Sequence, residues 1–221
     1  MSSETFPHHE IFNKKRPETR QNIEIQQGDA EVFIDEEIYQ GLVDYCRRVL
    51  KDKEEGKIPE NRNAKAFGVI IGKKHKGYIE VSDIIPLTRD LRQVEPYKSY
   101  MDEMVAKYAK PCPYCHIEDR GWYADPKEVL EVERKTSQKG DILGFFHMHS
   151  CPVPNIEMSQ VHMLDIALVS ENAPGYATVI IDMTSRTPKL RWFIIDEKKN
   201  VYECPIKITK KQNEGLEEGE K

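Results

Sequence analysis

An apolar run that ends in two histidines constrains the fold more than any other feature of this chain. The run Ile142-Leu-Gly-Phe-Phe146 is followed directly by His147-Met-His149. An uninterrupted apolar segment of this length is typical of a central strand that is buried on both faces. Alternate residues of a strand point to the same face. We therefore expect the imidazoles of His147 and His149 to be aimed together from the end of one rigid strand.

A third histidine, His162, follows a short loop later, near the expected start of a helix that begins at Ser159. Three neutral nitrogen ligands leave one position of a tetrahedral zinc ion open, which is the coordination of catalytic rather than structural zinc sites. The sequence thus predicts a Zn²⁺ site formed by His147, His149 and His162.

Size and composition restrict the class of protein. The chain has 221 residues, with 33 basic and 38 acidic side chains and a net charge of −5. No basic cluster is interleaved with aromatic residues and no stretch has the apolar length of a membrane span, so we expect neither a nucleic-acid partner nor a membrane partner. Five cysteines in a chain whose start does not resemble a signal peptide favour reduced thiols and a cytoplasmic location.

The chain is expected to form one domain between two polar ends. Residues 1–28 contain few apolar side chains and are predicted to be a flexible N-terminal arm, and residues 209–221 a charged, disordered tail. Residues 29–208 are predicted to form the metal-binding domain.

Periodicity and capping signals in that domain predict a mixed order of strands and helices. The strands are expected at residues 31–34, 66–72, 78–85, 142–149, 176–181, 190–195 and 201–208. The helices are expected from Asp35 to about 51, at 97–108, from Asp125 to Gly140, and at 159–170. This order indicates an α/β (α+β) domain with a mixed, largely antiparallel sheet flanked by helices, in three layers or wrapped.

Several of these segments resemble the JAB/MPN (JAMM) metalloprotease family. The resemblance lies in residues 68–72, 124–130 and 140–150 and in the Ser159-x-x-His162 spacing, and it extends over about residues 30–208. It implies the cytidine-deaminase-like architecture of JAB/MPN domains. It also implies a zinc site in which two strand histidines and an aspartate bind the metal, a serine helps to hold the oxyanion, and a strand glutamate is the general base.

Two positions depart from the family pattern. His147 and His149 match the histidine pair and Ser159 matches the catalytic serine, but His162 stands where the aspartate is expected. Asp165, one turn further on, is then either an outer partner of His162 or itself the ligand after a local shift. The glutamate position, three residues before Gly68, is occupied by Lys65, and an ammonium group does not accept a proton from water at ordinary pKa.

The segment Cys112-Pro-Tyr-Cys115-His116 has several possible interpretations. It matches the haem c attachment pattern, but that pattern requires export. It also resembles the glutaredoxin motif, although here it follows a helix and precedes a loop. The third interpretation is half of a structural zinc knuckle, completed by His116 or by Cys151, and the fourth is a loop without a further role. Cys46 and Cys204 are expected in the core.

Two functions follow from the resemblance. The first is a zinc-dependent hydrolase with altered catalytic machinery, acting on peptide or isopeptide bonds at the C-termini of ubiquitin-like or sulfur-carrier proteins. The second is a catalytically inactive JAB/MPN module that binds a protein partner. Lys65 favours the second function, whereas the histidines and Ser159 favour the first.

Overall fold

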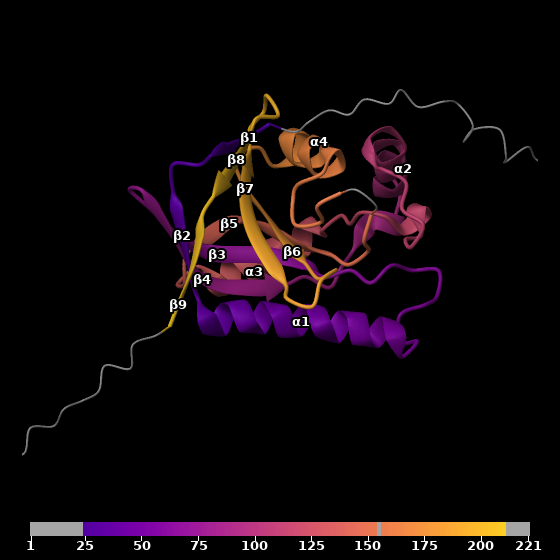
Figure 1. The fold of residues 1–221 in the computed structure, drawn as a ribbon, viewed down its shortest axis with the longest axis horizontal. Coiled ribbons are helices and arrows are strands. Elements are labelled where there is room, and N and C mark those ends of the chain that lie inside the picture. Colours follow the sequence, from indigo (N-terminus) through magenta and orange to yellow (C-terminus); the bar gives the residue numbers. More distant parts are fainter. Residues whose placement is uncertain (1–23, 154–155, 211–221) are drawn as a thin grey trace, which may run out of the picture.

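The computed structural model describes residues 24–153 and 156–210 of the chain, which form one large curled sheet with helices packed around it (Figure 1). The strands are β1 (Ile25–Gln27), β2 (Glu31–Asp35), β3 (Phe67–His75), β4 (Tyr78–Pro86), β5 (Asp141–His149), β6 (Ala177–Asp182), β7 (Lys189–Ile195), β8 (Val201–Cys204) and β9 (Ile206–Thr209). The helices are α1 (Glu36–Glu54), α2 (Tyr97–Tyr108), α3 (Pro126–Thr136) and α4 (Met163–Asn172), with short 3₁₀ helices at Leu91–Gln93 and Ile117–Asp119.

The sheet has the order β1-β8-β7-β6-β5-β3-β4-β2-β9 and is evenly mixed. Four of its neighbouring pairs are antiparallel (β3 with β4, β3 with β5, β6 with β7, β7 with β8) and four are parallel (β1 with β8, β2 with β4, β2 with β9, β5 with β6). The α+β class with a mixed sheet is confirmed. The expectation of a largely antiparallel sheet is wrong, because strands distant in sequence join both edges in parallel.

Pro205 divides the last predicted strand in two. β8 lies second from one end of the sheet and β9 forms the other end, although only Pro205 separates them in the chain. The two ends of the sheet are therefore brought near each other by curling. Proline cannot donate a ladder hydrogen bond, but the Pro205 carbonyl accepts one from Val32 N at 2.8 Å. A single strand at 201–208 is thus replaced by two strands with different partners.

The N-terminal boundary of the domain lies earlier than the sequence predicts. Residues 25–27, which we placed in the flexible arm, form β1 and pair in parallel with β8. Most of the predicted arm and residues 211–221 of the predicted tail lie outside the described residues.

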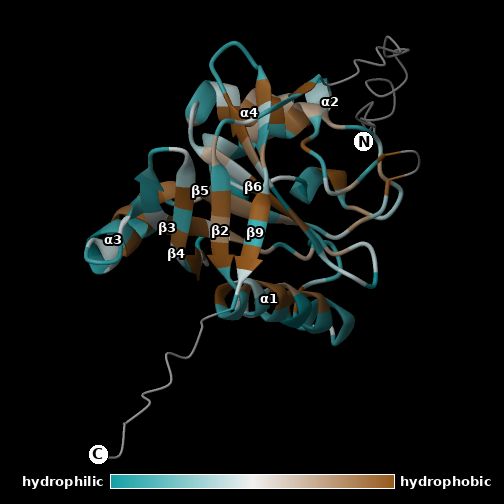
Figure 2. Cartoon of the chain, turned by 60° about the vertical axis from the view of Figure 1, so that its left-hand side comes forward, coloured by the Kyte–Doolittle hydropathy of each residue, from teal (hydrophilic) through white to brown (hydrophobic). Residues whose placement is uncertain are grey.

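The two faces of the sheet are covered by different helices. Leu42, Val43 and Cys46 of α1 pack in one hydrophobic cluster with Phe146 and Met148 of β5. In Figure 2 the hydrophobic side of α1 faces the strands. Phe145, which alternates with Phe146, joins a different cluster with Val129 and Val132 of α3. His147 and His149 lie two and four residues after Phe145, so their side chains point to the same face of the sheet as Phe145, opposite α1.

The other predicted helices form with small differences in their ends. α2 has the predicted bounds. α3 begins as predicted, with Asp125 Oδ1 accepting a hydrogen bond from Lys127 N at 2.9 Å, but it ends at Thr136 rather than near Gly140. Glu128 does not complete a capping box; its carboxylate instead accepts hydrogen bonds from the backbone amides of Thr88 and Arg89.

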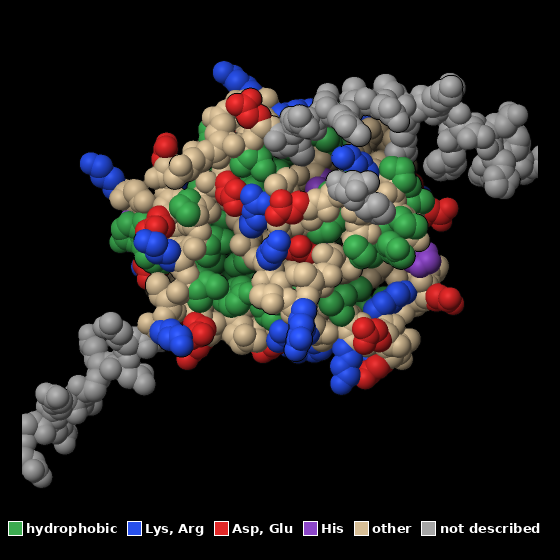
Figure 3. All heavy atoms as spheres, in the orientation of Figure 1, with side chains coloured by type: hydrophobic (Ala, Val, Ile, Leu, Met, Phe, Trp, Pro, Cys, Tyr) green, Lys and Arg blue, Asp and Glu red, His purple; other side chains and the backbone are tan. Residues whose placement is uncertain are grey.

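The surface shown in Figure 3 intersperses Lys and Arg with Asp and Glu, with hydrophobic side chains between them. Among the helices of residues 24–153 and 156–210, none is both long enough and apolar enough to cross a membrane.

Candidate metal centre

His147 and His149 converge at the end of β5, as the strand periodicity predicts. Their Nε2 atoms lie 3.0 Å apart. The indole of Trp122 packs beside the His147 ring, with ring centroids 6.2 Å apart, and stacks on Phe67 on the neighbouring strand. The sheet and this aromatic contact hold the two imidazoles in place before any ligand binds.

A carboxylate completes the group. Asp165 Oδ1 lies 3.3 Å from His147 Nε2, and Asp165 Oδ2 lies 3.9 Å from His149 Nε2. One ligand atom from each of these three residues lies within 4.8 Å of the others. Two imidazole nitrogens and one carboxylate oxygen are a ligand set that Zn²⁺ accepts with a fourth position open, so the residues present fit the predicted metal.

The start of α4 explains why Asp165 rather than His162 belongs to this group. The predicted helix start at Ser159 is wrong, since α4 begins at Met163 and His162 is its N-cap. Asp165 is the third residue of the helix, and its Oδ2 accepts a hydrogen bond from His162 N at 2.7 Å in a capping box. The residue that opens the helix is thus His162, three residues later than Ser159, and the residue three positions further on is Asp165 instead of His162. This places the Asp165 carboxylate beside the strand histidines.

His162 lies next to this group without belonging to it. Its ring stacks on the His149 ring, with centroids 4.7 Å apart and planes 19° apart. Its Nε2 lies 3.4 Å from the Glu157 carbonyl oxygen. His162 therefore packs over a member of the candidate metal-binding group.

The surroundings keep His149 neutral. Burial, together with the nearby His147, lowers the pKa of His149 to about 3. Its Nδ1 lies 2.5 Å from the carbonyl oxygen of Met158, so Nδ1 carries the proton and donates it, and the lone pair of Nε2 faces the group. This arrangement is the usual way in which a backbone oxygen orients a ligating histidine.

Asp165 is held in its ionised form. Burial by itself would raise the pKa of this carboxyl, but the adjacent histidines, foremost His147 with its hydrogen bond, lower it well below its ordinary range. A deprotonated carboxylate and a neutral imidazole are the forms that bind metal ions.

Ser159 is completely buried in the turn before α4. Its hydroxyl donates a hydrogen bond to Glu157 Oε1 at 2.8 Å. The second carboxylate oxygen of Glu157 accepts one from Gln160 Nε2 at 2.9 Å. Ser159 thus orients a carboxylate, three residues before the N-cap of α4 at His162.

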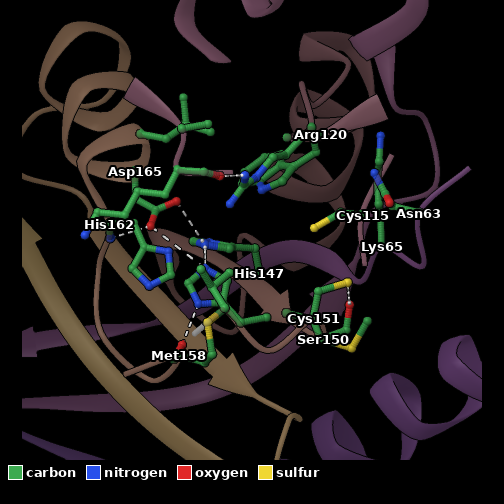
Figure 4. Close-up of a pocket in the computed structure, with 18 of the residues that line it drawn as sticks. Asn63, Lys65, Cys115, Arg120, His147, Ser150, Cys151, Met158, His162 and Asp165 are labelled. Atoms are coloured by element: carbon green, nitrogen blue, oxygen red, sulfur yellow. Dashed lines mark hydrogen bonds and ion pairs between the residues drawn. The ribbon is translucent and has the colours of Figure 1, made fainter. Parts of the chain in front are cut away.

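Lys65 precedes β3 by two residues and is engaged by carboxylates. Its Nζ lies 2.9 Å from Asp90 Oδ2 and 3.0 Å from Asp119 Oδ1, and its side chain is only 15% exposed. In Figure 4, Lys65 lies across the pocket from His147, His162 and Asp165. Lys65, at the position of the family's glutamate, is thus paired with Asp90 and Asp119.

The group opens onto a pocket of about 530 Å³, within the size range of small-molecule and peptide sites. His147, His149, His162 and Asp165 line one side of it. The other side includes Lys65, Arg120, Cys115 and Cys151.

Sequence reasoning treated Asp165 only as an alternative ligand and did not include Met158 or Glu157. The capping-box spacing His162-x-x-Asp165 was a usable signal for the true helix start. The Met158 contact uses a backbone oxygen. Every residue has one, so the residue type at this position does not predict the contact.

No protein-family model and no curated protein matches the chain. Among solved structures, it is similar to the solution structure of protein DSY2949 from Desulfitobacterium hafniense, with a TM-score of 0.53 and 15% sequence identity. The match covers 82% of this chain and 95% of the other. At this identity the similarity concerns the fold alone.

Proposed function

We propose that the protein is a zinc-dependent hydrolase of the JAB/MPN type with altered catalytic machinery, acting on peptide or isopeptide bonds of ubiquitin-like or sulfur-carrier proteins. The observation that carries the proposal is the convergence of His147, His149 and Asp165 at the wall of an open pocket. The family's serine-x-x-aspartate spacing at a helix start corresponds to His162-x-x-Asp165, with histidine in place of serine.

In this proposal the residues around the pocket have separate roles. Zn²⁺ held by His147, His149 and Asp165 would supply the Lewis acidity that polarises a scissile carbonyl. The Met158 carbonyl keeps His149 in the ligating tautomer, and the charge of Asp165 offsets part of the charge of the metal. The pocket beside them has room for an extended peptide segment.

Glu157 is the carboxylate best suited to accept a proton. The acidic residues that line the pocket are Asp119, Glu157 and Asp165. Asp165 is assigned to the metal. Asp119 is buried and accepts contacts from Asn63 N, Lys65 Nζ, Gln93 Nε2 and Arg62 Nε, so its lone pairs are occupied. Glu157 is half exposed and has fewer partners: Ser159 and Gln160 each donate to one of its carboxylate oxygens, and Arg191 Nη1 lies 3.5 Å from Oε1.

One observation favours the second function, a catalytically inactive module that binds a protein partner. Lys65 occupies the place of the family's general base, and its charge is balanced by Asp90 and Asp119. A lysine held as an ammonium between two carboxylates cannot act as that base.

The test compares zinc content and hydrolysis in the same preparations. The full-length protein, saturated with Zn²⁺, is incubated with ubiquitin-like and sulfur-carrier domains carrying a C-terminal peptide or isopeptide-linked fluorophore. We expect cleavage that chelation abolishes, and in Asp165→Ala we expect the loss of cleavage together with the loss of the zinc held by His147, His149 and Asp165. Zinc binding without cleavage of any of these substrates would contradict the proposed hydrolase and favour the catalytically inactive binding module.

A further inference from the structure

Three thiols from separate parts of the chain meet on the other side of the pocket. Cys112 and Cys115 lie in the turn between α2 and the 3₁₀ helix at Ile117–Asp119, and Cys151 lies two residues beyond the end of β5. Their Sγ atoms all lie within 4.8 Å of one another, and each residue is partly buried. All three are free thiols.

We propose that Cys112, Cys115 and Cys151 bind a second Zn²⁺ ion, at a site separate from His147, His149 and Asp165. The inference does not depend on the proposed hydrolase function, because it rests on a different group of residues. A Cys-x-x-Cys turn supplies two thiolates from one short segment, and a distant residue supplies the third, which is the usual construction of a zinc knuckle. Soft thiolate ligands select zinc over the hard cations magnesium and calcium.

The fold brings Cys151 and not His116 to the turn. The backbone of His116 is held by Asn63, whose Nδ2 donates to His116 O at 2.8 Å and whose Oδ1 accepts from His116 N at 2.9 Å. His116 is exposed and lies outside the thiol group, whereas Cys151 approaches the turn closely enough for its Sγ to lie 3.7 Å from Tyr114 O. Among the described residues the protein supplies three ligands, so the fourth position is left for water or another small ligand.

The charge near the thiols suits a metal site. Arg120 lies beside Cys115 and Cys151 at the pocket wall. Its guanidinium would offset part of the net negative charge of three thiolates around one Zn²⁺.

A metal at this position would connect two weakly structured segments. Residues 109–116 contain no helix or strand, and the segment after β5 leads into the loop that carries Met158. Cys115 and Cys151 both line the pocket, with Arg120 beside them (Figure 4). The second ion would therefore fix the pocket wall that faces the histidines.

The first experiment measures zinc by elemental analysis in the reduced, never-chelated, full-length protein and in single variants. We expect two equivalents in the native protein, one in Cys151→Ser and one in His149→Ala. Cys204→Ala, which removes a buried core thiol outside the group, serves as the matched control and should keep two. One equivalent in the native protein, lost in His149→Ala and retained in Cys151→Ser, would overturn the thiol site while leaving the histidine site intact.

The second experiment leaves all three cysteines unchanged and so is independent of any folding defect in a cysteine variant. Zinc X-ray absorption of the native protein should show sulfur scatterers at about 2.3 Å. With Co²⁺ in place of Zn²⁺, a thiolate-to-metal charge-transfer band should appear in the native protein and in His149→Ala. A zinc shell of nitrogen and oxygen only, or a Cys112–Cys115 disulfide in the metal-free isolated protein, would overturn the proposal.

Discussion

His149 Nδ1 lies 2.5 Å from the carbonyl oxygen of Met158, so a backbone oxygen in the loop before α4 determines which nitrogen of His149 faces Asp165. The loop and the strand are thereby coupled at the candidate metal centre. A candidate metal ligand on β5 is oriented by the same segment that carries Glu157 and Ser159. Changes in this loop should affect metal binding even though the loop itself supplies no ligand.

The third ligand can be identified by comparing Asp165 with His162. Asp165→Asn should lower zinc affinity by more than about 100-fold, the upper end of the cost of losing an outer partner of a ligand. His162→Ser should keep affinity within about tenfold, because serine is a good N-cap and His162 lies outside the ligand group. Competition titration with a zinc chelator measures both. The opposite order of effects would restore His162 as the ligand.

The metal-free protein should lose stability as the pH falls below about 6.5. The pKa of His149 is about 3 in the folded protein and about 6.5 when unfolded, so the unfolded chain binds the extra proton between these values. The free energy of unfolding should therefore decrease by up to about 1.4 kcal/mol per pH unit as the pH falls through this window. Asp165 has a lowered folded pKa, and its contribution is lost only below about pH 4.

Urea unfolding in chelator at pH 7.5, 6.0 and 5.0 measures this slope. His149→Gln should reduce the slope, and His75→Gln, on the β3–β4 hairpin, should not. A slope unchanged by His149→Gln would contradict the assignment of a buried, neutral His149.

Glu157→Gln tests the proposed proton acceptor. General-base catalysis contributes about 10²–10⁴-fold, so kcat should fall by an amount in this range while zinc content stays at the native value. Ser159→Ala, which removes one hydrogen bond to the Glu157 carboxylate, should produce a smaller loss in the same direction. Full activity in Glu157→Gln would show that another group accepts the proton.

Lys65→Glu should destabilise the protein and should not create activity. The substitution removes a cation between Asp90 and Asp119 and adds a third carboxylate in a side chain that is only 15% exposed. Removing one partner of a buried ion pair typically costs about 3–5 kcal/mol, and the residual exposure of Lys65 places the expected loss near the lower end. Lys65→Arg keeps the charge and serves as the control. Native stability in Lys65→Glu, by urea unfolding, would refute this role of the lysine.

Single helices and strands of this structure could be predicted from sequence, whereas strand partners and contacts between distant segments could not. The apolar run of β5, its two histidines and the bounds of α2 follow from periodicity within a single segment. The start of α4 could not be decided locally, because Ser159 and His162 both precede a plausible helix, and a shift of three residues changes which side chain faces the strand. The partners of β8 and β9 and the approach of Cys151 to Cys112 depend on tertiary packing.

The single residue between β8 and β9 has a consequence for synthesis of the chain on the ribosome. β2 and β4 precede β9 in the chain, so β2 lacks the partner on its other edge until residues 206–209 have emerged. Exposed edges of this kind invite pairing with other chains. A nascent polypeptide halted just before Ile206 would hold most of its sheet with this edge uncovered, and it is at this stage of translation that we expect chaperone dependence to be greatest.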